Sequence, residues 1–192
     1  MDYDISINKV NLSTHIINEI KRIDDIEGKR IHDLSWYVGR YSSDDVVYTL
    51  NDKDEIVGYL LVAGISKQLY KEIKSGKFDD NIEFDSKYFI PKSKYKYIES
   101  INILDKYRNK GYGTKLLYEA LKDNNVRVIA VADSVGGYNL AKKLMINTGK
   151  TNASKIFEKN TEIDKNTLII ALLAAILVVY ALFMFSVFTG FR

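Results

Sequence analysis

The stretch "YRNKGYGTKLL", Tyr107 to Leu117, combines an arginine, two glycines and two lysines. Gly111 and Gly113 allow a sharp backbone turn, and they let a ligand approach amide groups that a side chain would screen. The residues that follow recur with the spacing of a helix face: Leu116, Leu117, Ala120 and Leu121. The glycines therefore lie at a helix N-terminus, where free N–H groups and the positive end of the helix dipole converge. We expect an anion-binding turn here.

The composition indicates one domain of ordinary size with its own hydrophobic core. The 28 lysines and arginines nearly balance the 25 aspartates and glutamates and are spread along the chain, which argues against a nucleic-acid partner. The absence of cysteine excludes disulfides and thiolate metal sites. With only His15 and His32, a histidine-rich metal site is not indicated, and we expect no metal.

The segment "LIIALLAAILVVYALFMFSVF", Leu168 to Phe188, contains no charged residue. As a helix it matches the roughly 30 Å hydrocarbon core of a bilayer, and it lacks the polar stripe of a core helix. It predicts a single-pass membrane anchor. Lysines precede it at 150, 155, 159 and 165, whereas only Arg192 follows, which predicts a cytoplasmic N-terminal domain. The acidic start "MDYDISINKV" lacks the pattern of a secretory signal.

The remaining chain predicts an α/β domain in which helices flank a mixed, mostly antiparallel sheet. The expected order is strand (3–10), helix "STHIINEIKRIDDI", short helix "IHDLSWYVG", hairpin "DDVVYTLND" and "EIVGYLLVAGI", strand (95–104), the glycine turn with its helix, buried strand "VRVIAVADS", helix "YNLAKKLMINT" ending at Gly149, and strand "SKIFEKN". Residues 66–94 form an insertion, either a lid or surface decoration. The expected domains are 1–160, a linker at 161–167, the transmembrane helix at 168–188 and a tail at 189–192.

This order of elements, with "INILDKYRNKGYGTKLLYEAL" in its middle, resembles the GNAT superfamily of acyl-CoA-dependent N-acyltransferases. "RNKGYG" fits the family's Arg/Gln-x-x-Gly-x-Gly/Ala pattern, after a strand and before a helix. The resemblance implies acetyl-CoA as co-substrate, with main-chain bonds from Ile101 and Ile103 to its pantetheine arm. The implied phosphate-binding and other cofactor-binding residues are Arg108, Asn109, Lys110, Gly111, Tyr112, Gly113, Thr114 and Asn139.

A second family signature fits only in part. Ala141, Leu144 and Gly149 fall in step with it, but Tyr138 stands at the usual asparagine, with Asn139 one place late. Met145 occupies the position of the tyrosine that, in the family, protonates the departing thiolate. The short chain after Gly149 predicts a closing hairpin reduced to one strand.

Acyl transfer requires a neutral amine, and the ammonium group of a lysine, with a pKa of about 10.4, needs a base more than an α-amine of pKa about 8. Glu99 is the candidate base, because relatives often place a catalytic carboxylate on this strand. Strict alternation puts Glu99 on the same face as the core residues Ile101 and Ile103, and a bulge would resolve this conflict. The alternative role is a structural ion pair. Tyr138 is the candidate acid and Tyr97 a more distant one, with packing as the alternative role for both.

The leading hypothesis is a membrane-tethered N-acetyltransferase acting on an amine at the cytoplasmic membrane face: a protein N-terminus, a lysine or a small amine. The alternatives are a catalytically degenerate GNAT-fold module serving as a membrane-anchored scaffold, and a viral structural protein. Met145 and the short C-terminus favour the degenerate module, whereas the intact "RNKGYG" favours the enzyme.

Overall fold

The computed structural model describes residues 4–41, 46–77, 86–122, 125–150 and 154–159. The expected linker at 161–167, transmembrane helix at 168–188 and tail at 189–192 lie outside these ranges. Within them, the helices are too short or too polar to cross a bilayer.

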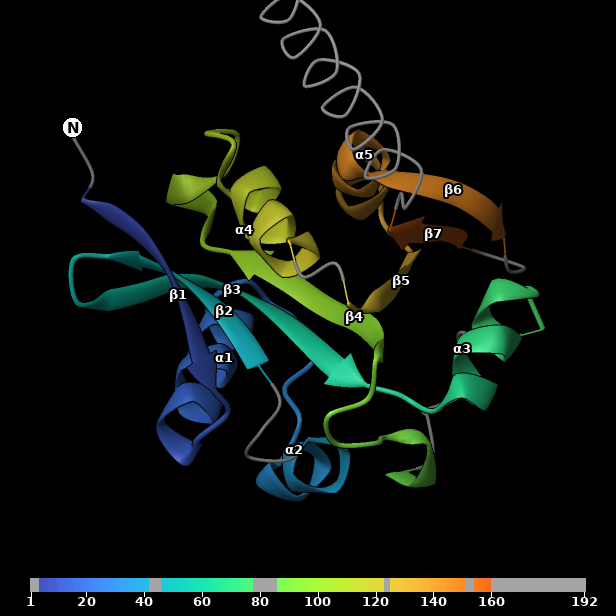
Figure 1. The fold of residues 1–192 in the computed structure, drawn as a ribbon. Helices are drawn as coiled ribbons and strands as arrows, with labels where there is room; N and C mark the ends of the chain where they lie inside the picture. Colours follow the sequence, from blue (N-terminus) through green and yellow to red (C-terminus); the bar gives the residue numbers. More distant parts are fainter. Residues whose placement is uncertain (1–3, 42–45, 78–85, 123–124, 151–153, 160–192) are drawn as a thin grey trace, which may run out of the picture. The chain divides into compact units, whose positions relative to one another are not determined.

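A seven-stranded mixed sheet forms the centre of the domain, with strand order β1-β2-β3-β4-β5-β7-β6 (Figure 1). Neighbouring strands are antiparallel except β4 and β5, which run parallel. The strands are β1 (Ile5–Asn11), β2 (Val46–Asp52), β3 (Glu55–Gly64), β4 (Tyr95–Ile103), β5 (Arg127–Ala132), β6 (Met145–Lys150) and β7 (Lys155–Lys159). The prediction of a mixed, mostly antiparallel sheet is confirmed.

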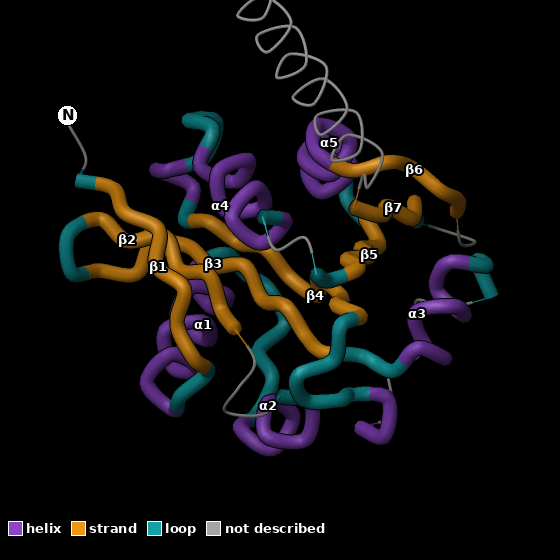
Figure 2. Tube along the Cα trace, in the orientation of Figure 1, coloured by secondary structure: helices purple, strands orange, loops and turns teal. Residues whose placement is uncertain are grey.

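Helices cover both faces of this sheet, as the tube view makes plain (Figure 2). They are α1 (Thr14–Ile26), α2 (Leu34–Arg40), α3 (Lys67–Lys74), α4 (Tyr112–Leu121) and α5 (Val135–Leu144). In the view of Figure 1, α1 and α2 lie below the sheet, and α4 lies above it with α5 packed beside it. The predicted inward face of α1 is confirmed, since its isoleucines at 16, 17, 20 and 23 are all buried and Ser13 caps its first turn.

The chain between α5 and β7 corrects one prediction. The helix expected to run to Gly149 ends at Leu144, and Met145–Lys150 is strand β6. The apolar spacing of "LMINTG" suits a helix locally, but β-branched Ile146 and Thr148 favour a strand, and pairing with β7 supplies the backbone hydrogen bonds. Gly149 is therefore a strand residue rather than a helix cap. The closing hairpin has two strands, β6 and β7, instead of the single strand predicted.

The insertion at 66–94 is packed against the sheet where the structure describes it. Ser66 caps α3, whose Tyr70 hydroxyl donates to Glu158 of β7 at 2.5 Å. The segment after the undescribed residues 78–85 returns to the end of β3, where the Ile90 amide donates to the Gly64 carbonyl at 2.8 Å. Residues 66–77 and 86–94 do not line the pocket described below, so this part of the insertion packs on the core, through Leu69, Ile73 and Phe89, rather than covering the site.

Candidate active site

Glu99 occupies a β-bulge in β4. Ser100 pairs with Leu61 and Ile98 pairs with Val62, so Glu99 is an additional residue without a partner on β3. The bulge resolves the expected conflict, because it breaks the alternation between Glu99 and the residues that follow it on the strand. The buried Tyr41, which follows α2, donates its hydroxyl hydrogen to Glu99 Oε2. This bond fixes the position of the carboxylate.

Beyond Glu99, β4 separates from its parallel neighbour. Pairing between β4 and β5 ends at Ile98 and Ala130, although β4 continues to Ile103. Because the Leu104 amide donates to Val57 on the β3 side, alternation directs the main-chain groups of Ile101 and Ile103 into the gap left by β5. The Ile103 amide and carbonyl are already bonded to the Asn102 and Arg108 side chains. Of the two predicted main-chain contacts, Ile101 is therefore the better placed.

The glycine turn leads into α4 as the sequence predicts. Asn109 and Gly111 have φ angles of 59° and 81°, in the left-handed region that glycine tolerates best. Gly111 is the N-cap of α4, and it has no side chain to bond the amides of the first turn. The other α-helices in the described ranges begin at side-chain caps: Ser13, Asp33, Ser66 and Ser134. The first-turn amides of α4, including those of Tyr112, Gly113 and Thr114, thus lack the side-chain cap that the other helices have.

The two cations of the turn make contacts within the protein. The Arg108 guanidinium forms an ion pair with Glu27, at the end of α1, and donates from Nε to the Ile103 carbonyl at 2.7 Å. Lys110 Nζ donates to the Lys106 carbonyl at 2.8 Å. Arg108 therefore joins the end of α1 to the end of β4.

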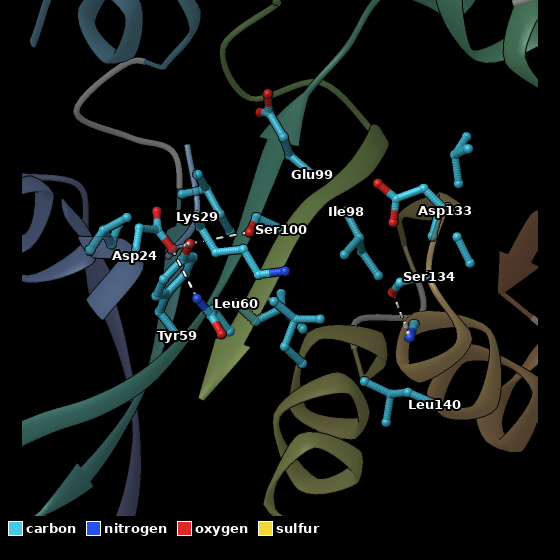
Figure 3. A pocket seen from close by; sticks show the side chains of 18 of the residues that line it. Asp24, Lys29, Tyr59, Leu60, Ile98, Glu99, Ser100, Asp133, Ser134 and Leu140 are labelled. Carbon is cyan, nitrogen blue, oxygen red and sulfur yellow. Dashed lines mark hydrogen bonds between the residues drawn. The ribbon is translucent and has the colours of Figure 1, made fainter. Parts of the chain in front are cut away.

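A pocket of about 530 Å³ lies at the separation of β4 and β5. Figure 3 shows Asp24 and Lys29 on one side of it, Glu99 above, and Asp133 and Ser134 on the opposite side. Its lining also includes Leu117 of α4 and Leu140 of α5; because Asp24 belongs to α1, the pocket draws on helices from both faces of the sheet. The candidate base and the free edge of β4 therefore share one cavity.

A buried polar network forms one wall of this pocket. Asp24 Oδ1 accepts hydrogen bonds from the Tyr59 hydroxyl at 2.6 Å and from Asn102 Nδ2 at 3.0 Å. Burial and the Asp24 carboxylate raise the pKa of Tyr59 above its usual range. Burial, Asp24 and Glu99 likewise raise the pKa of Tyr37, which also lines the pocket. Both phenols are therefore neutral hydrogen-bond donors at physiological pH.

Asp24 was not predicted as a site residue, although the sequence holds a signal for it. It lies four residues after Ile20 and directly after Ile23, so helical spacing turns this carboxylate toward the core. An acidic residue on the buried face of an amphipathic helix is rare unless it is paired.

The other predicted residues lie elsewhere. Tyr138 packs its ring against Phe157, with centroids 5.7 Å apart, and neither Tyr138 nor Tyr97 lines the pocket. Asn139 is exposed on α5. Met145 is buried and does line the pocket. The structure thus does not bring the candidate acid Tyr138 into the cavity that holds Glu99. In the described ranges, no three His, Cys, Asp or Glu side chains are grouped as metal ligands.

The model of the acetyltransferase (GNAT) family matches residues 15–132, which is more than half of the chain. The chain belongs to the GNAT acetyltransferase family. No curated protein sequence matches it significantly.

Solved structures share the fold at low sequence identity. Arabidopsis thaliana NAA60 in complex with acetyl-CoA is 15% identical, with a TM-score of 0.55, over 80% of this chain and 98% of that one. An acetyltransferase from Thermus thermophilus is 11% identical, with a TM-score of 0.55, over 82% and 99%. N-acetylglutamate synthase from Neisseria gonorrhoeae, complexed with coenzyme A and L-arginine, is 13% identical, with a TM-score of 0.53, over 82% of this chain and 33% of that one. At these identities the likeness shows the fold alone.

Proposed function

We propose that the protein is a membrane-tethered N-acetyltransferase that transfers the acetyl group of acetyl-CoA to an amine. One observation carries the proposal: the bulged Glu99 and the unpaired edge of β4 line the same pocket. A thioester in the gap between the strands would lie beside a carboxylate able to accept a proton. Membership of an acetyltransferase family supports this reading, as does the bound acetyl-CoA of NAA60.

The cofactor-binding part combines the gap with the glycine turn. A pyrophosphate needs several convergent donors, and the amides of Tyr112, Gly113 and Thr114 supply them at the positive end of α4. The Ile101 main chain would pair with the pantetheine amides as a neighbouring strand does. Asn109, Lys110 and Asn139 are exposed, and they remain proposed contacts at the rim. Gly113 lies against Leu140 of α5, which lines the pocket, so the glycine turn lies next to the pocket wall.

Glu99 would act as the general base. It takes a proton from the acceptor ammonium or from the attacking amine, directly or through a water molecule. The amine nitrogen bonds to the thioester carbon, the C–S bond breaks, and coenzyme A leaves as a thiolate. Tyr41 holds the carboxylate in place through its hydrogen bond.

Departure of the coenzyme A thiolate does not require a side chain that acts as an acid. A thiol has a pKa of about 8.5, so its conjugate base is a tolerable leaving group near neutral pH and can take its proton from water. This is consistent with the buried Met145 in the pocket, where many relatives would carry a tyrosine.

The tether would be the uncharged segment 168–188, which makes the protein single-pass with its N-terminal domain in the cytoplasm. The acceptor is then a protein N-terminus, a lysine or a small amine near that membrane face. Attachment to the same membrane raises the local concentration of such acceptors without any new contact.

Thiol release from acetyl-CoA tests this proposal. The full chain, in detergent or nanodiscs, is incubated with a panel of peptides and small amines, and free thiol is measured with a chromogenic disulfide. We expect release that depends on the amine and is absent without protein. Release that never exceeds the hydrolysis seen without an amine would rule out acetyl transfer to this panel.

A second candidate function is a catalytically inactive module that retains the cofactor. The observation in its favour is Met145 at the position of the usual acid. This candidate predicts acetyl-CoA binding without amine-dependent thiol release, so the same assay, combined with a binding measurement, separates the two.

A further inference from the structure

Asp24 presents one of its two carboxylate oxygens to the pocket. The residue is 6% exposed, and its Oδ1 accepts both hydrogen bonds of the network, from Tyr59 and Asn102. Oδ2 receives no hydrogen bond or ion pair from the part of the chain that the structure describes. Oδ2 is not fully enclosed and keeps some solvent-accessible surface. Asp24 lines the pocket.

In this position, Oδ2 of Asp24 is stabilised by a hydrogen-bond donor. Leaving a largely buried charged acceptor without a hydrogen bond is costly, and charged donors bind it most strongly. Tyr59 has a single hydroxyl hydrogen, which it donates to Oδ1, and the Asn102 amide also donates to Oδ1 rather than to Oδ2. The donor for this oxygen is therefore a water molecule or a ligand group in the pocket, and a charged ligand group would bind it more strongly.

The charges around the pocket favour a cation. Among the described residues, three carboxylates line it, on Asp24, Glu99 and Asp133, against two cationic side chains, on Lys29 and Arg30. Lys29, Arg30 and Asp133 are exposed, whereas Asp24 is buried. Solvent screens the two cations more than it screens Asp24. Lys29 reaches toward the interior in Figure 3, but no ion pair with Asp24 forms.

Asp24 and Glu99 act on the same region of the pocket. Both carboxylates raise the pKa of Tyr37, whose ring comes from α2 and lines the cavity. Asp24 comes from α1 and Glu99 from the bulge of β4, and Figure 3 shows both carboxylates at the pocket. A molecule with two separated nitrogens can form a hydrogen bond with each of these two carboxylates.

We propose that Asp24 binds a second, unreacted ammonium group of the acceptor while Glu99 serves the amine that is acetylated. The inference deepens the proposed function and depends on it for the identity of the reacting amine. It assigns the acceptor to one chemical class, molecules with a second cationic nitrogen near the reactive amine. Small diamines belong to it, and so do peptides with a lysine close to the N-terminus.

The proposal is tested by comparing the binding of acceptors that are similar in size but carry either one or two positive charges. Binding of 1,4-diaminobutane and of butylamine to the full chain, with coenzyme A present, is measured by calorimetry. A tripeptide with lysine at the second position, compared with its norleucine counterpart, forms the peptide arm. We expect the dicationic member of each pair to bind about tenfold to hundredfold more tightly, as for a charge-assisted hydrogen bond away from bulk water.

Asp24→Asn is the decisive variant. An asparagine oxygen can keep both bonds at the Oδ1 position, but its amide nitrogen then replaces the open oxygen. We expect the preference for the dication to disappear, with the affinities for butylamine and coenzyme A unchanged. Asp25→Asn is the control, because Asp25 is the exposed neighbour on the same helix turn.

Equal affinities within both wild-type pairs overturn the proposal, and so does equal weakening of both members by Asp24→Asn. If Asp24→Asn does not fold, as judged by circular dichroism, the wild-type comparison alone decides. A preference for the dication without thiol release leaves the subsite intact and counts against acetyl transfer. Thiol release that is equal for both members of each pair counts against the subsite only.

Discussion

At the scale of single residues, the account depends on the carboxylate at the β4 bulge. The place of Glu99 on the strand that leads to the glycine turn could be predicted from sequence, and its role as the base stays a prediction. The setting of Glu99 could not be predicted: Tyr41 lies 58 residues earlier in the chain and reaches it only in the folded domain. The same holds for Asp24, whose partners Tyr59 and Asn102 are 35 and 78 residues away. Local sequence patterns predict which face of a helix or strand carries a side chain, but they do not predict its tertiary contacts.

If Glu99 is the base, Glu99→Gln should lower turnover by roughly 10² to 10⁴ while leaving acetyl-CoA affinity nearly unchanged. The amide keeps the size and an acceptor for Tyr41 but cannot take a proton. Steady-state thiol release across a full pH profile measures the first effect, and calorimetry measures the second. Coincident pH profiles for wild type and variant would remove Glu99 from the mechanism.

At the scale of elements, substitutions at two glycines at the start of α4 distinguish an effect on stability from an effect on ligand binding. Gly111 has a φ of 81°, where a side chain is strained by about 1 to 2 kcal/mol. At Gly113 a new Cβ would meet Leu140 and Ile103 at 3.5 and 3.7 Å, which is ordinary contact.

We therefore expect Gly111→Ala to lower the melting temperature, whereas Gly113→Ala should leave it unchanged or raise it. Gly113→Ala should nevertheless weaken acetyl-CoA binding, because its methyl group screens an amide that faces the pyrophosphate. Lys115→Ala, on the exposed side of the same helix, is the control. Unchanged acetyl-CoA affinity in Gly113→Ala would show that the turn serves folding only.

The prediction of helices and strands from sequence succeeded where hydrophobic periodicity and capping residues agree, and it was wrong for Met145–Lys150. For α1, the isoleucine spacing and the Ser13 cap indicate the same helix, and it forms. For Met145–Lys150, apolar spacing suits a helix while the β-branched Ile146 and Thr148 favour a strand, and pairing with β7, which begins ten residues after β6 begins, decides between them. Conflicting local signals of this kind are resolved by a partner that the segment itself does not contain.

At the scale of the whole molecule, residues 1–159 form a compact unit by contacts among themselves. We expect removal of 168–192 to give a soluble, folded domain with an unchanged melting transition, because residues 1–159 form a compact unit of their own. Circular dichroism and size-exclusion chromatography check this. A truncated chain that aggregates, while the full chain in detergent stays folded, would make 168–188 a core element instead of an anchor.

The buried tyrosines predict how this domain responds to alkali. Burial raises the pKa values of Tyr37, Tyr59 and Tyr70 above their unfolded value of about 10. A group whose pKa is higher in the folded state stabilises the fold fully below its unfolded pKa. That contribution is lost as pH rises through the folded pKa. We therefore expect the free energy of unfolding to fall above about pH 10, and phenolate absorbance to lag behind that of the denatured chain. Simultaneous titration of all tyrosines near their ordinary pKa in the folded protein would contradict this burial.

The central claim is that the gap between β4 and β5, together with the turn at Arg108 to Thr114, binds acetyl-CoA. Calorimetric titration of the full chain with acetyl-CoA and with desulfo-CoA tests it most directly, since both ligands carry the pyrophosphate and the pantetheine arm. The account predicts saturable binding of both, accompanied by a rise in melting temperature. The absence of heat and of any thermal shift with either ligand at millimolar concentration would contradict it.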